Sequence, residues 1–402
     1  MKFSILSSDL QRALARLGGV VPSRSAMPIL EHILIDVSRD ESGVNTLKLT
    51  ATDLEITASV SLPLTGDGSI ELGKIAAPAR RLSDTVRALP DIPLSFSADL
   101  ATNKIVILTE SGEYQLTGEL SEEFPAPAEF RTGDKPVQFS IESNVLRGLA
   151  AKTSFAVSTD ELRPAMLGVL LQLRSNEVRA VATDGHRLVK VVRTGIGAGT
   201  DRDVIIPSKA LNLLLHGTES APGKGERKET TGVSIGQSHI RFDMGPSVLI
   251  SRLIEENYPN YESVIPLDNT KRLIVSRAGI LASVRRVALY ASSITRQIRL
   301  QIAPQGAPLL QVSAEDVDFG GGARETLQCE YEGEPLEIGF NARYVEDLLN
   351  HLESDRVVFQ LSTPTRAAVV KPHVAAAPKE DEADGACSED ILMLVMPIRL
   401  NS

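Results

Sequence analysis

The sequence predicts an α+β fold made of three copies of one domain, in which antiparallel sheet is covered on one face by two helices. Three observations predict this class. A strand followed by an amphipathic helix recurs at one spacing, other landmarks recur in the same order, and strands outnumber helices in every copy. Repetition at a fixed period indicates that one structural unit has been copied along the chain. A chain of 402 residues is also too long for a single ordinary core.

The first landmark is a short strand followed by an amphipathic helix. The strands begin at Phe3, Phe139 and Leu273, so the copies are spaced by about 135 residues. The helices that follow are expected at residues 8–17, 143–153 and 277–290. Apolar residues recur in them at spacings of three and four, which predicts one buried face on each helix.

Three further landmarks recur in the same order. Strand–turn–strand passages are expected at residues 47–62, 178–192 and 309–319, with Thr-Asp or Glu-Asp at the turn. A second helix begins near Pro78, Pro207 and Asn341. A bulky residue followed by proline closes each copy, at Phe124-Pro125, Tyr258-Pro259 and Met396-Pro397. The repetition predicts three domains, at residues 1–130, 135–265 and 268–402.

Two segments interrupt the repeat. Residues 217–232 are rich in Gly, Lys and Glu, which is typical of an exposed hairpin loop. Residues 371–390 contain a run of alanines followed by a mainly acidic stretch, and the first two copies have no counterpart to them. Such a composition predicts a surface insertion in the third domain.

Composition favours a soluble, cytoplasmic protein that needs no cofactor. Apolar residues make up 42% of the chain and charged residues 23%, and no apolar run approaches the ~18 residues of a membrane helix. The first residues lack the apolar stretch of a signal peptide. Cys329 and Cys387 are too few for a disulfide framework and wrongly spaced for zinc. No glycine-rich phosphate loop or metal-ligand spacing is present.

The net charge of −10 argues against nucleic acid unless the cations gather locally. The repeat places cations at two equivalent helix positions in all three copies. In the first helix these are Arg16, Lys152 and Arg286, and in the second they are Arg80, Lys209 and Arg343. Any solvated helix carries Lys and Arg, so a single position would mean little. The second set, however, lies in first helical turns, where the helix dipole disfavours positive charge.

A nearby anion would offset that cost, so the recurrent cations predict a basic helical face. Such a face attracts phosphates without reading bases, which suits a protein that slides along any double-stranded sequence. Aromatic residues amount to only 4%, which argues against stacking on single-stranded bases.

Several segments closely resemble the bacterial sliding clamp family, the beta subunit of DNA polymerase III. The resemblance extends in order over essentially the whole chain. The matching segments are Arg24 with Met27–Leu30, Thr183–Leu188, Tyr258–Tyr261, Gly339–Tyr344 and Val395–Leu400.

The resemblance implies a processivity factor of DNA replication that is not an enzyme. Two three-domain chains would form a head-to-tail homodimer, closing a ring around duplex DNA with sheets outside and helices inside. Edge strands of the first and third domains would pair across the contact. A clamp loader would open the ring. The polymerase catalytic subunit and other clamp-motif proteins would dock a short peptide between the second and third domains.

The resemblance also implies which residues form the sites. The partner-peptide positions match here as Met166, Thr183, Gly185, His186, Arg187, Leu188, Pro259, Val264, Asn341, Tyr344, Met396, Pro397, Ile398, Arg399 and Leu400. Met166, Leu188, Val264, Met396 and Ile398 would form an adaptable apolar pocket. His186, Arg187, Asn341 and Arg399 would supply polar contacts to an extended peptide. Arg24 would contact DNA, together with the six recurrent helix cations.

Four positions depart from the family pattern. Ser263 stands where a basic residue is common, and Thr365 replaces a more usual apolar residue. Asn401 and Ser402 extend the chain beyond the usual terminal leucine. These differences bear on the polar contacts and on access to the peptide site.

Two alternatives belong to other functional classes. An enzyme could use Asp184, His186 and Arg187 in a cleft between domains, although Asp184-Gly185 is foremost a hairpin turn signal. A repeat scaffold without a DNA role would carry the same fold. Turnover lost in His186→Ala would indicate the enzyme, and failure to remain on closed circular DNA would indicate the scaffold.

Overall fold

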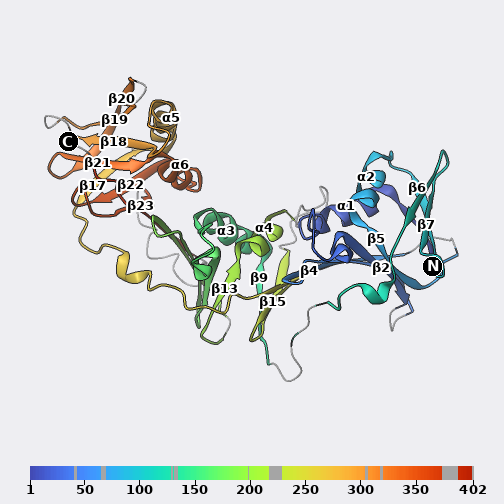
Figure 1. Ribbon diagram of the computed structural model, residues 1–402. Coiled ribbons are helices and arrows are strands. Elements are labelled where there is room, and N and C mark those ends of the chain that lie inside the picture. The colour runs from blue at the N-terminus through green and yellow to red at the C-terminus, as the bar shows by residue number, and fades with distance from the viewer. Residues whose placement is uncertain are drawn as a thin grey trace. The chain divides into compact units, whose positions relative to one another are not determined.

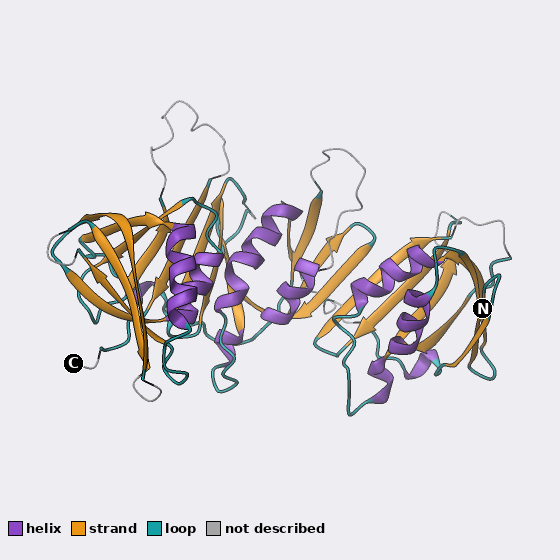
Figure 2. Ribbon diagram, turned by 90° about the horizontal axis from the view of Figure 1, so that it is seen from above, coloured by secondary structure: helices purple, strands orange, loops and turns teal. Residues whose placement is uncertain are grey.

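The computed structural model describes residues 1–39, 43–64, 69–127, 130, 135–197, 199–216, 229–303, 307–316, 320–373 and 388–400. Within these ranges the chain forms three antiparallel sheets and six α-helices, which confirms the predicted fold class (Figures 1 and 2). Most of the predicted hairpin loop 217–232 and of the insertion 371–390 lies outside the described residues, as do Asn401 and Ser402.

The chain divides into two compact units. The first comprises Met1–Arg147 with Lys209–Leu253, and the second comprises Gly148–Ser208 with Ile254–Ser402. The predicted central domain, residues 135–265, therefore contributes to both units. The three domain boundaries remain a prediction.

The first unit contains two sheets. The smaller has the order β1 (Lys2–Leu6), β6 (Pro93–Asp99), β7 (Lys104–Leu108) and β8 (Glu113–Thr117). The larger has the order β5 (Gly73–Pro78), β2 (His32–Arg39), β3 (Asn45–Thr52), β4 (Ile56–Pro63), β16 (Ser247–Arg252), β15 (His239–Met244), β14 (Thr230–Ile235) and β9 (Val137–Glu142). The pairing of β4 with β16 makes one continuous sheet from strands of the first and second copies.

The second unit contains one long sheet. Its order is β13 (Arg202–Pro207), β10 (Gly168–Leu173), β11 (Glu177–Thr183), β12 (Arg187–Thr194), β24 (Glu389–Val395), β23 (Ala368–Pro372), β22 (Arg356–Leu361), β17 (Lys271–Ser276), β20 (Gly321–Glu332), β19 (Leu309–Asp316), β18 (Gln297–Ile302) and β21 (Leu336–Asn341). The pairing of β12 with β24 joins the second copy to the third, as β4 and β16 join the first to the second.

Each copy contributes two α-helices, as predicted. They are α1 (Ser7–Leu17), α2 (Ala79–Ala88), α3 (Ser143–Thr153), α4 (Ser208–His216), α5 (Arg277–Ala288) and α6 (Ala342–Asn350). In α1 the buried face consists of Leu10, Ala13, Leu14 and Leu17 with Ser7, so the spacing of three and four identified it correctly. Helices α1 and α2 pack against each other, and so do α5 and α6 (Figure 1).

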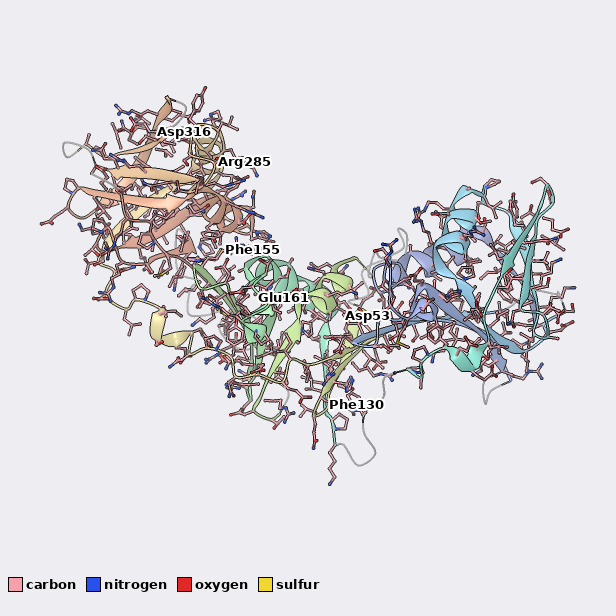
Figure 3. All side chains as sticks on the ribbon, in the orientation of Figure 1. Asp53, Phe130, Phe155, Glu161, Arg285 and Asp316 are labelled. Carbon is pink, nitrogen blue, oxygen red and sulfur yellow. The ribbon has the colours of Figure 1, made fainter. Side chains whose placement is uncertain are left out.

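One turn shows the repetition at atomic detail. After β3, the amides of Glu55 and Ile56 donate to Asp53 Oδ1 at 3.1 and 2.7 Å, and Thr52 Oγ1 donates to the Ile56 carbonyl. After β11, the amides of His186 and Arg187 donate to Asp184 Oδ1 at 2.9 and 3.0 Å, and Thr183 Oγ1 donates to the Arg187 carbonyl. The same Asx-type turn therefore occurs in both copies. Figure 3 labels Asp53, the aspartate of this turn in the first copy.

The tail of each copy also docks in the same way. An isolated bridge joins the strand before the second helix to the closing segment, at Ala76–Glu119, Ile205–Ile254 and Gly339–Ile398. In the third copy this contact requires glycine. A Cβ on Gly339 would lie 2.7 Å from Leu400 Cδ2 and 2.8 Å from the Ile398 carbonyl oxygen. Gly339 thus allows the end of the chain to lie against β21.

Candidate functional site

The turn between β11 and β12 is the centre of the candidate partner site. Gly185 has a φ of +88°, a conformation that glycine adopts without strain. The Thr183 hydroxyl accepts from the Gly185 amide at 3.1 Å and is itself buried. These bonds fix the turn and leave His186 exposed at its tip.

Arg187 is buried behind this turn and is bonded to three elements. Its Nε donates to Asp184 Oδ2 at 3.0 Å, and its two terminal nitrogens donate to Asp347 Oδ2 at 2.5 Å and to the Phe155 carbonyl at 2.8 Å. The guanidinium carbon also lies 4.9 Å from the centre of the Tyr344 ring and 5.4 Å from that of Phe155. Both distances are within the range of cation–π attraction. Arg187 therefore connects β12, the 3-10 helix η3 (Ser154–Ala156) and α6.

The side of the turn that faces solvent meets α6 and the closing segment of the chain. The rings of His186 and Tyr344 stack with centroids 5.9 Å apart. The amide of Met396 donates to the His186 carbonyl at 2.8 Å, and the amide of Ile398 donates to the Gly339 carbonyl at 2.8 Å. Segments far apart in sequence are thus held together around His186.

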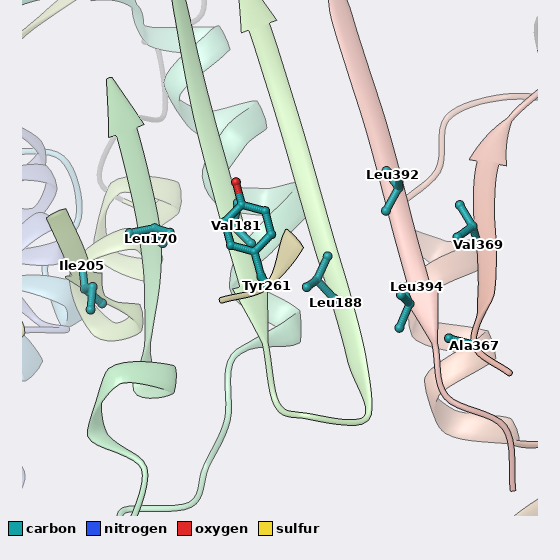
Figure 4. Packing of buried hydrophobic residues seen from close by; sticks show 9 residues of the cluster. All are labelled: Leu170, Val181, Leu188, Ile205, Tyr261, Ala367, Val369, Leu392 and Leu394. Atoms are coloured by element: carbon teal, nitrogen blue, oxygen red, sulfur yellow. The ribbon is translucent and has the colours of Figure 1, made fainter. Parts of the chain in front are cut away.

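An apolar cluster contains residues of β12 and β24 and of the strands beside them (Figure 4). It comprises Leu170, Val181, Leu188, Ile205, Tyr261, Ala367, Val369, Leu392 and Leu394. Ala165, Tyr258 and Ile265 pack against it. These three are the sequence neighbours of the predicted site residues Met166, Pro259 and Val264, so the cluster brings all three segments to the same part of the unit.

The predicted partner residues differ in accessibility. Met166, Thr183, Arg187 and Leu188 are buried. Asn341, Tyr344, Pro397, Ile398 and Leu400 are partly exposed. Gly185, His186, Pro259, Val264, Met396 and Arg399 are exposed, including large apolar surfaces on Val264 and Met396. An extended peptide can bind a surface that combines exposed apolar side chains, aromatic rings and exposed polar groups.

Asn341 and Ser263 have local structural partners. The Asn341 side chain caps α6 by accepting from the Arg343 amide at 3.0 Å, and its Nδ2 donates to the Thr295 carbonyl at 3.4 Å. Ser263 donates to the Asn260 carbonyl at 2.7 Å. Ser263 thus closes a local turn.

Two hydroxyl groups of this region have raised pKa values. Burial is the largest cause of the raised pKa of Tyr344, and the Asp184 carboxylate adds to it. Burial also raises the pKa of Tyr258. Both rings stay neutral at physiological pH and act as apolar and hydrogen-bonding surfaces. Among the described residues, no group of three or more His, Cys, Asp and Glu could hold a metal ion.

The recurrent helix cations are not equivalent. Arg80, Lys209, Arg286 and Arg343 are exposed, as is Arg24 outside the recurrent set, and Arg80 pairs with Asp84 at 4.0 Å. Arg16 donates to Ser247 Oγ at 3.0 Å, Lys209 pairs with Asp53, and Arg286 donates twice to Glu325 at 2.7 Å. The pairing of Arg286 lowers the pKa of Glu325.

The expected position of Lys152 on an exposed helix face is wrong. Its side chain is only 11% exposed, and its Nζ lies 2.6 Å from Glu389 and 3.3 Å from Glu353. A buried ammonium requires such partners because desolvation of an unpaired charge is costly. Lys152 links α3 to β24 and to the segment after α6, so it does not belong to a basic surface.

Protein-family models match all three copies of the repeat. Models of the N-terminal, central and C-terminal domains of the DNA polymerase III beta subunit match residues 1–128, 140–260 and 262–384. The beta sliding clamp of Vibrio cholerae is 30% identical over 401 residues and that of Synechococcus elongatus is 32% identical over 408, both with full coverage of each chain.

The chain belongs to the bacterial beta sliding clamp family. Solved sliding clamps agree with this assignment. The clamp from Pseudomonas aeruginosa bound to griselimycin superposes with a TM-score of 0.86 at 30% identity, and the clamp from Bartonella birtlesii bound to griselimycin superposes with 0.85 at 31%, both over the full length of each chain. Sliding clamps are processivity factors of replication and are not enzymes, so the alternative of catalysis by Asp184, His186 and Arg187 is wrong. None of the helices in the described ranges could span a membrane.

Proposed function

We propose that two copies of this chain close a ring around duplex DNA in the cytoplasm, and that the surface around His186 tethers the DNA polymerase III catalytic subunit and other clamp-motif proteins. The domain boundaries at residues 1–130, 135–265 and 268–402 are part of this proposal. The convergence of the β11–β12 turn, α6 and the closing segment 396–400 carries it, because these segments assemble one accessible surface from the second and third copies.

Open strand edges support ring closure by the homodimer. Strand β8 pairs only with β7 among the described residues. In β20, residues Gly321–Gln328 pair with β19, whereas pairing with β17 is confined to Cys329–Glu332. The first part of β20 therefore has a second edge that no other described strand covers. Unpaired edges invite pairing with another chain.

Exposed apolar residues follow α5, and one of them, Tyr290, lies beside the start of β20. Leu289 is 81% exposed and Ile294 is 85% exposed, and Tyr290 lies within 4 Å of a Cβ built on Gly321. An exposed apolar group of this kind is typical of an interface between proteins. We propose that β8 of one copy pairs with β20 of the other, a heterologous contact that closes after two subunits.

Five of the proposed DNA contacts have exposed side chains: Arg24, Arg80, Lys209, Arg286 and Arg343. Arg16, Arg80, Lys209 and Arg286 would contribute after exchanging their present partners Ser247, Asp84, Asp53 and Glu325. Contacts from Lys and Arg to phosphate are independent of base sequence, as sliding requires.

Primer extension tests the function directly. The polymerase catalytic subunit would extend a singly primed long template with and without this chain, with a clamp loader present in both reactions. We expect longer products only when the chain is present. Products of unchanged length would contradict the proposed function.

Griselimycin tests the partner surface separately from DNA. The Pseudomonas aeruginosa and Bartonella birtlesii clamps are solved bound to it. We expect this chain to bind griselimycin in calorimetry and His186→Ala to bind it less tightly. Absence of binding by the unaltered chain would contradict the assignment of the surface.

A further inference from the structure

The Arg187 side chain is hydrogen-bonded to other residues of the same chain. Three of its five N–H groups donate to Asp184, Asp347 and the Phe155 carbonyl. The residue is 8% exposed, whereas His186 beside it is exposed at the tip of the turn. A side chain so placed has little freedom to hydrogen-bond a docked peptide, in contrast to what its position in the sequence implies.

The partners of Arg187 are the elements that carry the accessible rings. Asp184 belongs to the turn that presents His186, and Asp347 lies on α6 three residues after Tyr344. The guanidinium also lies 4.9 Å from the centre of the Tyr344 ring, and that ring stacks on His186. Arg187 therefore bridges the turn and α6, the two elements that carry these rings.

We propose that Arg187 is a positioning residue for the partner site, and that it acts through Asp347 to hold Tyr344 of α6 in register with His186 of the turn. This inference rests on the proposed function of that surface. Asp347 is the new member of the site. Its carboxylate acts through Arg187, while its main-chain carbonyl contacts His351 Nδ1 at 2.7 Å.

The charge balance makes Asp347 the better residue to change. Two carboxylates, Asp184 and Asp347, pair with one guanidinium. Removal of Arg187 would leave two carboxylates without their cation, and an uncompensated charge of this kind is strongly destabilising. Removal of Asp347 leaves Arg187 paired with Asp184 and in contact with the Tyr344 ring, so the ion pair to α6 is lost without leaving an unpaired charge.

The neighbouring carboxylate provides a matched control. Glu346 also lies on α6 and pairs with Arg285 of α5 at 2.8 Å. The side chains of Glu346 and Asp347 are 32% and 29% exposed. Glu346 ties α6 to α5 and has no bond to the β11–β12 turn among the described contacts. Replacement of either carboxylate by alanine suits a helix.

The experiment measures griselimycin affinity by calorimetry in Asp347→Ala, Asp347→Asn and Glu346→Ala, together with the thermal unfolding of each. We expect Asp347→Ala to bind about tenfold more weakly, as coupled contacts commonly do when one is removed. Asp347→Asn retains a hydrogen-bond acceptor and should fall between. Glu346→Ala should bind like the unaltered chain. If Asp347→Ala unfolds at a lower temperature than the unaltered chain, the affinity of Asp347→Asn decides the result.

A double-mutant cycle separates positioning from general destabilisation. Arg187→Lys keeps the charge but loses the planar fork that reaches several partners. If Arg187 acts through Asp347, the double variant Arg187→Lys with Asp347→Ala should lose no more affinity than the weaker-binding single variant. Additive losses, or unchanged affinity in Asp347→Ala, would overturn the inference while leaving the proposed function intact. An unaltered chain that fails to bind griselimycin would overturn the site assignment and this inference together.

Discussion

The main-chain amide of Met396 donates to the carbonyl of His186 across 2.8 Å, which joins the closing segment of the chain to the β11–β12 turn. The two residues belong to the third and second copies of the repeat. The bond continues the pairing of β12 with β24, whose last matched residues are Arg187 and Val395. The pairing of β12 with β24 therefore places Met396 next to the β11–β12 turn.

Removal of the closing segment should abolish partner binding. A chain ending at Val395 loses Met396 and the Ile398–Gly339 bridge but keeps every residue of β24. We expect no measurable binding of griselimycin by calorimetry. The edges of β8 and β20 are untouched, so size-exclusion chromatography should still give the dimer. Retained affinity would refute the assignment of residues 396–400 to the site.

Substitution of Gly185 should destabilise the turn. With a φ of +88°, alanine at this position costs about 1–2 kcal/mol of folding free energy because its Cβ crowds the backbone. Leu54 occupies the equivalent place in the first copy at a φ of +78° and already bears that strain. Leu54→Ala is therefore the matched control and should change the free energy of unfolding much less. Equal losses in urea unfolding would show that the turn conformation is not the cause.

Release of Arg286 should strengthen DNA binding. Both nitrogens that it directs to Glu325 would become available to phosphate in Glu325→Gln. We expect tighter binding to duplex DNA and a steeper salt dependence, by about one unit in the slope of log K against log salt. Glu330→Gln is the control, because Glu330 is also on β20 and pairs with Arg356 instead. A slope that changes equally in both variants would argue against a role for Arg286.

Asp203 should contribute to stability in a pH-dependent way. Burial raises the pKa of this carboxyl, but hydrogen bonds from Arg174 and Gln172 outweigh burial and leave the pKa below its ordinary value. Because the folded pKa is depressed, the stabilisation is complete above the unfolded value and is lost as pH falls through the folded value. Urea midpoints measured from about pH 6 to pH 3 should fall less steeply in Asp203→Asn. If the urea midpoints of both proteins fall in parallel with pH, Asp203 does not contribute to the pH dependence of stability.

The sequence predicted local features more accurately than long-range ones. Spacing within α1 identified its buried face, and the recurrent Thr-Asp pairs marked two turns with the same hydrogen bonds. Both features depend on neighbours a few residues away. A helical pattern also placed Lys152 with Arg16 and Arg286 on an exposed face. Lys152 is instead buried and donates to Glu389, 237 residues further along the chain.

The network around Arg187 was missed for the same reason. Asp347 and Phe155 lie 160 and 32 residues from Arg187 in sequence. Nothing in the helical pattern of α6 distinguishes Asp347 from Glu346 beside it, which pairs with Arg285 instead. The positions of the partner site came from the family resemblance, whereas the distinction between residues that face a ligand and those that position them required the fold.

The proposed ring is tested most directly on circular DNA. The chain, loaded by a clamp loader onto nicked circular duplex, would be separated from free protein by gel filtration, and the DNA would then be cut once. We expect the protein to stay with the circle at moderate salt and to leave after linearisation, because a ring slides off free ends. Equal retention on circular and linear DNA would contradict encirclement.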